Sequence, residues 1–374
     1  MVKVLNIISD ANIGGAGRVL LNYLRFADTN AFETAVCLPR GSLLAEPLRN
    51  AGARVIEADI KPNASFSPAD IKTLQKIIRQ LSPDIVHTHG SLSGRIAARR
   101  CHRAVITTRH SVFPVSPRLK SGPGHLLNKL INEHYADRFI AVSPAAKENL
   151  TDGGIRGDMI DVVMNGVEPI TRVSPNERTR IRAEYGLRDD DFAAGILARL
   201  EPYKGQALIL DAAKILKDDG LPIRIFIAGA GPDEQVLRQK ALSLSLDDTV
   251  TFLGFVTDVA PLLNALDVQL NASYGTEASS LSLLEGMSLG LPAIVSDYGG
   301  NPFVIENGVN GLVFRSRDTK ALAGCIRRLV GNTDLLSRLS ASAEVVFRER
   351  FTGETFAGNI ERIYRDVLKG DHDG

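Results

Sequence analysis

The sequence has few cysteines and no long apolar run. Its three cysteines, Cys37, Cys101 and Cys325, are far apart, odd in number and without metal-ligand spacing, so a reducing cytoplasm is the simplest setting. No apolar run reaches the roughly 18 residues that a transmembrane helix needs. The opening MVKVLNIIS is typical of a strand and lacks the charged segment and cleavage site of a secretory signal. These features predict a cytoplasmic globular protein.

The chain also has little net charge, with 44 Lys and Arg against 43 Asp and Glu. The charges are unevenly spread, because residues 1–168 hold 21 basic and 15 acidic side chains together with six of the seven histidines. Such an asymmetry indicates different partners for the two halves. It favours a first half that meets an anionic partner such as a membrane surface, with ordinary scatter of charge as the alternative.

Short β-rich runs alternate with helical stretches, without an internal repeat or a low-complexity tract. A chain of 374 residues exceeds what one hydrophobic core organises, and a polar stretch at residues 166–188 interrupts the alternation before it restarts. This pattern predicts parallel sheets with helices on both faces. We therefore expect an α/β protein of two doubly wound, Rossmann-like domains, residues 1–168 and 172–350, facing each other across a cleft. A helix at about 352–370 is expected to pack back on the first domain.

A glycine-rich turn, SDANIGGAGR at residues 9–18, follows the first expected strand and opens a helix. Gly14, Gly15 and Gly17 let backbone N–H groups approach a phosphate at the helix N-terminus, although glycines also form tight turns without a ligand. The stretch does not match G-x-G-x-x-G, and the second strand ends in CLPRGS without an acid to hold a ribose. Both departures disfavour a dinucleotide-dependent enzyme.

A basic loop leaves the first strand of the second half in ILARLEPYKG, residues 196–205. The forked guanidinium of Arg199 and the mobile ammonium of Lys204 can together neutralise a diphosphate, and a solvated basic loop is the alternative. Further along, Gly229 again ends a strand and opens a helix. The strand VTFLGFV, which contains Phe252, offers backbone groups that could read a base edge.

Two glutamates, Glu277 and Glu285, stand eight positions apart in NASYGTEASSLSLLEGMSLGLP. In a continuous helix they would lie about 12 Å apart. Glycosidase carboxylates lie only about 5 to 9.5 Å apart, so a paired acid and base is disfavoured. Glu277 is expected in a loop and Glu285 one turn inside the following helix. The alternative for Glu285 is a capping box with Ser282, which would leave Glu277 unexplained.

Taken together, these motifs resemble those of the retaining glycosyltransferases of family 4, which have the GT-B fold. Two glutamates separated by seven residues are part of that family's signature. Its R-x-x-x-x-K-G loop is matched by Arg199, Lys204 and Gly205, and its strand-end NGV by residues 165–167. The stretch LEGMSLGLPAIVSDYGGNPFVIENGVNGLVF is similar to the most recognisable part of the family. The resemblance covers nearly the whole chain.

The resemblance implies a role for each matching residue. Arg199 and Lys204 would hold the donor diphosphate, while Glu285 would accept hydrogen bonds from the ribose and Glu277 would contact the transferred sugar. His110 would reach that sugar from the N-terminal domain. The implied catalytic residues are His110, Glu277, Arg199 and Lys204. The implied donor-binding residues are Gly14, Gly15, Arg199, Lys204, Gly229, Phe252, Glu277, Ala278, Ser279, Ser280, Leu281 and Glu285. The implied acceptor-side residues are Arg18, His89 and Asn165.

One departure from the family pattern concerns the sugar pocket. The family often has Gly-Phe-Gly after the first glutamate, whereas this chain has Ala278-Ser279-Ser280. No catalytic metal is expected, and we interpret the acidic run Asp189–Asp191 as an exposed polar turn rather than a metal site.

The implied activity is transfer of a sugar from a UDP-sugar, or a GDP-sugar, to a glycan or lipid-linked acceptor in bacterial cell-surface polysaccharide synthesis. The protein would be cytoplasmic or peripheral at the inner membrane face, without a nucleic-acid partner. A nucleotide-sugar 2-epimerase of the same architecture, an NAD-dependent dehydrogenase and a non-catalytic nucleotide-sugar binding module are the alternatives.

Overall fold

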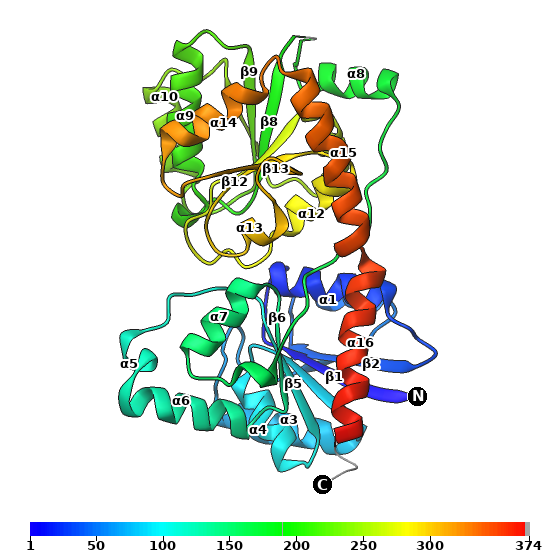
Figure 1. Ribbon diagram of the computed structural model, residues 1–374. Coiled ribbons are helices and arrows are strands. Elements are labelled where there is room, and N and C mark those ends of the chain that lie inside the picture. Colours follow the sequence, from blue (N-terminus) through cyan, green and yellow to red (C-terminus); the bar gives the residue numbers. More distant parts are fainter. Residues whose placement is uncertain (189, 371–374) are drawn as a thin grey trace. The chain divides into compact units, whose positions relative to one another are not determined.

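The computed structural model describes residues 1–188 and 190–370 (Figure 1). The chain forms two compact units. Unit 1 contains Met1–Val167 and the chain from Phe351 onward, and unit 2 contains Glu168–Arg350. Each unit is a parallel sheet with helices between its strands, so the prediction of two Rossmann-like α/β domains is confirmed.

Unit 1 holds a seven-stranded sheet of order β3-β2-β1-β4-β5-β6-β7, with every pair parallel. Its strands are β1 Val2–Ile8, β2 Phe32–Pro39, β3 Arg54–Ala58, β4 Ile85–His89, β5 Ala104–Arg109, β6 Arg138–Ala141 and β7 Ile160–Val162. Its helices are α1 Gly15–Phe26, α2 Ala45–Asn50, α3 Pro68–Leu81, α4 Leu92–Arg100, α5 Pro117–Lys120, α6 Gly122–His134, α7 Pro144–Asp152, the 3-10 turn Gly157–Met159 and α16 Gly353–Gly370. The strand order reverses between β1 and β4, which is where ligands of such sheets bind.

Unit 2 holds a six-stranded parallel sheet of order β10-β9-β8-β11-β12-β13. Its strands are β8 Phe192–Leu197, β9 Ile223–Ala228, β10 Val250–Gly254, β11 Val268–Asn271, β12 Ala293–Ser296 and β13 Gly311–Phe314. Its helices are α8 Pro175–Glu184, α9 Gln206–Asp218, α10 Glu234–Ser243, α11 Ala260–Ala265, α12 Leu281–Ser288, α13 Asn301–Val304, α14 Thr319–Leu329, α15 Thr333–Arg350 and the 3-10 turn Pro202–Lys204. Here the order reverses between β8 and β11.

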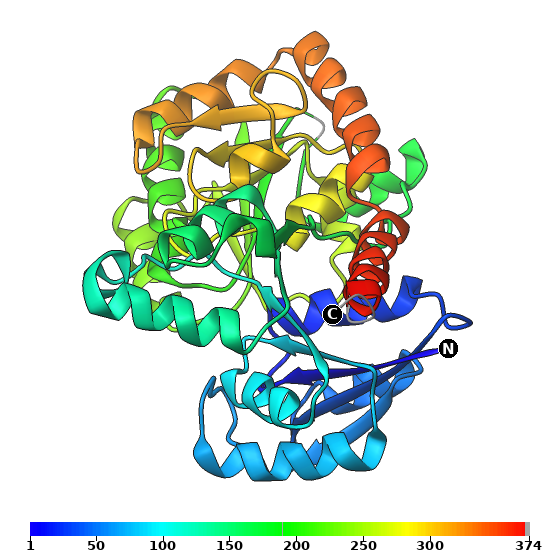
Figure 2. The same cartoon turned by 60° about the horizontal axis from the view of Figure 1, so that its bottom comes forward.

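The last helix, α16, belongs to unit 1 although it follows unit 2 in the chain. It lies beside α1 in both views (Figure 1 and Figure 2). Tyr364 packs edge-on against the ring of Tyr23 on α1 at 6.1 Å and against Phe32 at 5.6 Å. At the start of the helix, an added Cβ on Gly353 would collide with the ring of Phe26, so the close approach of α16 to α1 requires glycine there.

The acidic turn at Asp189–Asp191 corrects part of the sequence interpretation. Asp189 lies outside the described residues. Asp191 is buried rather than exposed, because its carboxylate accepts hydrogen bonds from the backbone N–H and the guanidinium of Arg188, both at 2.9 Å. The carboxylate therefore closes the turn that precedes β8.

Candidate active site

The loop after β8 carries the predicted phosphate-binding residues of unit 2. Pro202–Lys204 form a single 3-10 turn, and Gly205 follows with φ 78° as the N-terminal cap of α9. An added Cβ on Gly205 would collide with the carbonyl oxygen of Ala272, just past β11. Only glycine combines this φ with this contact, so Gly205 brings Lys204 to the end of the neighbouring strand.

Lys204 meets Glu277 at that point. The Lys204 Nζ donates to Glu277 Oε2 at 2.8 Å, and the same oxygen accepts from Asn271 Nδ2 at 3.2 Å and from Ser273 Oγ at 3.0 Å. Glu277 is 4% exposed. Burial alone raises the pKa of this carboxyl, but the Lys204 ammonium and the hydrogen bonds outweigh it, so the pKa lies below its usual value. The site therefore holds a buried, ionised glutamate paired with a half-buried lysine, and three hydrogen bonds converge on one oxygen of that carboxylate.

Two glycines after β12 hold the loop that carries Glu277. The Gly300 N–H donates to the Glu277 carbonyl at 3.0 Å. Added Cβ atoms on Gly299 and Gly300 would collide with the carbonyl oxygens of Glu277 and Ala278. Sequence reasoning did not assign a role to either glycine or to the hydrogen-bond donors Asn271 and Ser273. The paired glycines in the turn after β12 are the signal that could have identified the first two.

Arg199 lies outside this hydrogen-bonded cluster. Its guanidinium pairs with Glu201 at 2.6 Å and its side chain is 72% exposed. Its backbone is fixed, because Gln206 Nε2 donates to the Arg199 carbonyl at 2.9 Å. Arg199 is therefore a solvent-facing cation on an anchored loop, available to an anion that arrives from outside.

Glu285 is the fifth residue of α12, one turn inside the helix as predicted. The capping-box alternative is wrong. The N-terminal cap is Ser280, which makes no side-chain capping bond, and Ser282 is already the second helical residue. The Ser282 hydroxyl donates to the Leu197 carbonyl at 3.1 Å instead. Because a capping box needs its glutamate at the third helical position, Glu285 cannot serve as one.

The segment from Ala278 to Leu281 leads into the N-terminus of α12. Ala278 is buried, and the Ser279 hydroxyl is buried without a hydrogen-bond partner among the described residues. Since Ser280 provides no side-chain cap, the first N–H groups of α12 remain open to an anion. The short side chains that replace Gly-Phe-Gly thus leave both a helix N-terminus and an unmatched hydroxyl beside Glu277.

Gly229 and Phe252 have mainly structural contacts. Gly229 has φ 145°, and an added Cβ would collide with the Ala198 carbonyl, so it packs under the loop that carries Arg199. The Arg238 guanidinium lies 4.8 Å from the centre of the Phe252 ring, and that ring packs against the core of unit 2.

In unit 1, Gly14 caps α1 without a side-chain capping bond, and Gly15 is the first helical residue. The first turn contains no acidic side chain, but Asp10 Oδ2 lies 3.5 Å from where a Cβ of Gly14 would stand, so a carboxylate already lies beside the N-terminus of α1. Arg18 is half-buried in the next turn, while Asn165 is buried with its Oδ1 lacking a partner among the described residues.

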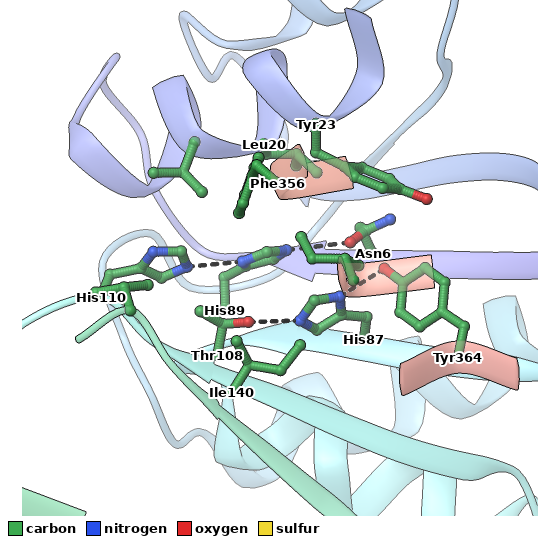
Figure 3. A pocket seen from close by; sticks show the side chains of 13 residues that line it. Asn6, Leu20, Tyr23, His87, His89, Thr108, His110, Ile140, Phe356 and Tyr364 are labelled. Carbon is green, nitrogen blue, oxygen red and sulfur yellow. Dashed lines mark hydrogen bonds between the residues drawn. The ribbon is translucent and has the colours of Figure 1, made fainter. Parts of the chain in front are cut away.

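Three histidines of unit 1, His87, His89 and His110, form a buried row along β4 and just after β5 (Figure 3). His89 Nδ1 is 2.8 Å from His110 Nε2, and the two rings stack. His89 is 8% exposed, and its Nε2 is 3.1 Å from Asn6 Oδ1, so neither ring nitrogen is left for the acceptor contact that was predicted. His87 is 2.7 Å from both the Tyr364 hydroxyl and the Thr108 hydroxyl.

Burial lowers the pKa of all three histidines. The pKa of His110 falls to about 4 and that of His87 to about 3, with His110 adding to the effect of burial on His87. Burial also puts the pKa of His89 well below its usual value. All three rings are therefore neutral near pH 7, and each carries one ring proton.

Metal ligation has no candidate cluster in residues 1–188 and 190–370. No group of three or more His, Cys, Asp or Glu side chains there is arranged to hold a metal ion. The same residues also contain no helix of the length and apolarity that crossing a bilayer requires.

Two family signatures cover most of the chain. Residues 13–170 match the family described as Glycosyltransferase Family 4, and residues 177–346 match the family described as Glycosyl transferases group 1. The N-acetyl-alpha-D-glucosaminyl L-malate synthase of Bacillus anthracis is 30% identical over 321 residues, which are 83% of this chain and 82% of that protein.

A second relative and a solved structure match over nearly the full length. The UDP-Gal:alpha-D-GlcNAc-diphosphoundecaprenol alpha-1,3-galactosyltransferase of Escherichia coli is 25% identical over 98% of this chain and 97% of its own. The crystal structure of Anabaena HepE in complex with UDP has a TM-score of 0.83 at 21% identity, covering 98% of this chain and all of that one, and it shows the shared fold. The chain therefore belongs to the family 4 glycosyltransferases with the GT-B fold.

Proposed function

We propose that this glycosyltransferase takes a sugar from a UDP-sugar, or a GDP-sugar, and transfers it with retention of anomeric configuration to a glycan or lipid-linked acceptor. The observation that carries the proposal is the pairing of half-buried Lys204 with buried Glu277 where the strand order of unit 2 reverses, beside the open N-terminus of α12. A mobile cation, an open helix N-terminus and a fixed carboxylate are the groups that a sugar diphosphate needs.

The basic residues of the proposed site stabilise mainly the negative charge on the departing diphosphate. The bond from the anomeric carbon to the phosphate oxygen breaks, and a bond from that carbon to the acceptor oxygen forms on the same face. The released phosphate oxygen takes the proton of the acceptor hydroxyl. Lys204, Arg199 and the N-terminus of α12 stabilise the negative charge that grows on the diphosphate. His110 and the second oxygen of Glu277 contact the transferred sugar.

The nucleoside is assigned to the same unit. Glu285 accepts hydrogen bonds from the ribose hydroxyls, and backbone groups around Phe252 contact the base. The complex of Anabaena HepE with UDP supports uridine as the first choice. Catalysis by these groups requires no metal, because Arg199 and Lys204 supply the positive charge at the phosphates.

Nucleotide binding provides the first test. In a thermal-shift series with UDP, GDP, ADP and NAD, we expect UDP or GDP to raise Tm, since a ligand at a hundred times its Kd stabilises the native state by about 2.7 kcal/mol. NMR of the transfer product should then show the same anomeric configuration as the donor. Stabilisation by NAD alone would overturn the proposal. Release of a rearranged sugar without any acceptor would replace it with the epimerase alternative.

The acceptor is proposed to be presented at a membrane, with the protein peripheral at its inner face in bacterial cell-surface polysaccharide synthesis. Helix α6 exposes three leucines, Leu126, Leu127 and Leu130, each between 55% and 59% exposed. The exposed basic side chains of Arg118 and Lys120 lie on the adjacent helix α5. Exposed leucines next to basic side chains are typical of a helix that lies on an anionic bilayer. The diphosphoundecaprenol acceptor named for the Escherichia coli relative supports a lipid-linked substrate.

We expect the protein to co-sediment with anionic vesicles and to dissociate from them as the salt concentration is raised. Each basic side chain near the surface contributes about 1 kcal/mol of binding free energy, and salt screens this attraction. A triple variant in which Leu126, Leu127 and Leu130 are each changed to serine should no longer sediment with the vesicles at moderate salt. The control is Leu242→Ser, since Leu242 is equally exposed, at 62%, on α10 of unit 2. Sedimentation that depends neither on anionic lipid nor on these leucines would remove the membrane assignment.

A further inference from the structure

Asn6, His89 and His110 form a continuous buried chain of polar contacts in unit 1 (Figure 3). Asn6 stands on β1, His89 at the end of β4 and His110 just after β5, so three neighbouring strands hold the chain. Its two ends are unusual, because Asn6 Nδ2 and His110 Nδ1 are buried without a hydrogen-bond partner among the described residues. A buried polar atom without a partner is costly unless a ligand completes its bonding.

The oxygen of Asn6 determines where each proton in this chain lies. Since Asn6 Oδ1 only accepts, His89 must carry its single ring proton on Nε2 and donate it to Asn6. His89 Nδ1 then has a lone pair and accepts from His110 Nε2–H across 2.8 Å. His110 Nδ1 is consequently left as a bare acceptor. The acceptor oxygen of Asn6 therefore determines the tautomer of His89, and the tautomer of His89 determines that of His110.

We infer that Asn6 and His89 are positioning residues that hold His110 in the tautomer with Nδ1 unprotonated, so that this nitrogen accepts a hydrogen bond from a substrate hydroxyl. The inference rests on the proposed contact of His110 with the transferred sugar. It goes beyond that contact by stating which ring nitrogen is used and what the substrate must supply, namely a hydroxyl that donates rather than a group that accepts.

The other groups around the chain leave this order of protons undisturbed. Tyr23 of α1 and Tyr364 of α16 line the same small cavity, and burial raises the pKa of both hydroxyls, so they stay neutral. His87 stacks on His89 but forms its hydrogen bonds with Tyr364 and Thr108. These contacts form a separate branch, which supplies a matched control.

Nitrogen-15 NMR of imidazole-labelled protein tests the inference without any substrate. In the wild type, long-range proton–nitrogen correlations should show His110 with a protonated Nε2 and a bare Nδ1. The isosteric change Asn6→Leu should convert this single tautomer into a mixture. The control Thr108→Val removes a bond to His87 only, and it should leave the His110 spectrum unchanged. A wild-type His110 protonated on Nδ1 would overturn the inference, whether or not Asn6→Leu folds.

Kinetics provide the second measurement. Asn6→Leu should lower kcat about tenfold while the Kd for bare UDP stays within twofold, because a misplaced proton disturbs only the contact made by the reacting sugar. Unchanged kcat in Asn6→Leu together with a mixed His110 tautomer would overturn the catalytic part of the inference. If UDP failed to bind the wild type, the proposed function would fall, whereas the tautomer measured by NMR would stand as a separate result.

Discussion

Replacing Arg199 with alanine should lower kcat/KM for sugar transfer about a hundredfold, through loss of about 3 kcal/mol of charge stabilisation in the transition state. The variant should fold, since the Arg199 side chain is 72% exposed, but its partner Glu201 is largely buried, with its side chain 13% exposed. Because the Glu201 carboxylate loses its cation, a modest drop in Tm is expected. Transfer rates are therefore measured well below the Tm of the variant, where they report on catalysis.

Lys204→Ala should cost at least as much activity, but it also changes the interior of unit 2. Removing Lys204 leaves the buried Glu277 carboxylate without its cation, which typically costs about 3 to 5 kcal/mol of stability. The double change Lys204→Met with Glu277→Gln removes both charges at similar volume and should restore much of the lost Tm. It should remain as inactive as Lys204→Ala.

The control for these variants is Lys214→Ala on α9, where Lys214 forms a surface pair with Asp218. It should change neither transfer rate nor Tm appreciably. Rates within threefold of the wild type in both Arg199→Ala and Lys204→Ala would rule out the diphosphate assignment.

The two-domain architecture could be predicted from the sequence because β-rich runs and helical stretches alternate on both sides of residues 166–188. The basic loop with Arg199 and Lys204 was equally visible, since it follows directly after a strand. These features are local, and short windows of sequence carry them.

The pairing of Lys204 with Glu277 could not be predicted, because the two residues are 73 positions apart and meet only through the adjacency of β8 and β11. The hydrogen bonds made by the row of His87, His89 and His110 also join residues that are far apart in the sequence. Tyr364 reaches His87 from 277 positions further along the chain. The return of its helix to the first domain was expected, but which of its side chains would meet His87 was not. The capping-box alternative for Glu285 was wrong by two helix positions, since the N-terminal cap is Ser280 rather than Ser282.

The two glutamates of the signature make different contacts, and their substitutions should therefore fail in different ways. Glu277 holds Lys204, Asn271 and Ser273 on one oxygen, which leaves the other for the sugar. Glu285 lies in the second turn of α12, where it is proposed to meet the ribose. Calorimetric titration of bare UDP separates the two roles, because UDP carries the ribose but not the sugar.

Glu285→Gln should weaken UDP binding by about 1.5 to 3 kcal/mol, roughly tenfold to a hundredfold in Kd, because a charged acceptor of two hydroxyls is lost. Glu277→Gln should leave UDP affinity unchanged or slightly improved, since Lys204 loses a competing carboxylate, while kcat falls by about a hundredfold. The control Glu184→Gln, whose side chain is 59% exposed on α8, should alter neither quantity. Because Glu285 is too deep in its helix to cap it, unchanged UDP affinity in Glu285→Gln would refute the ribose assignment outright.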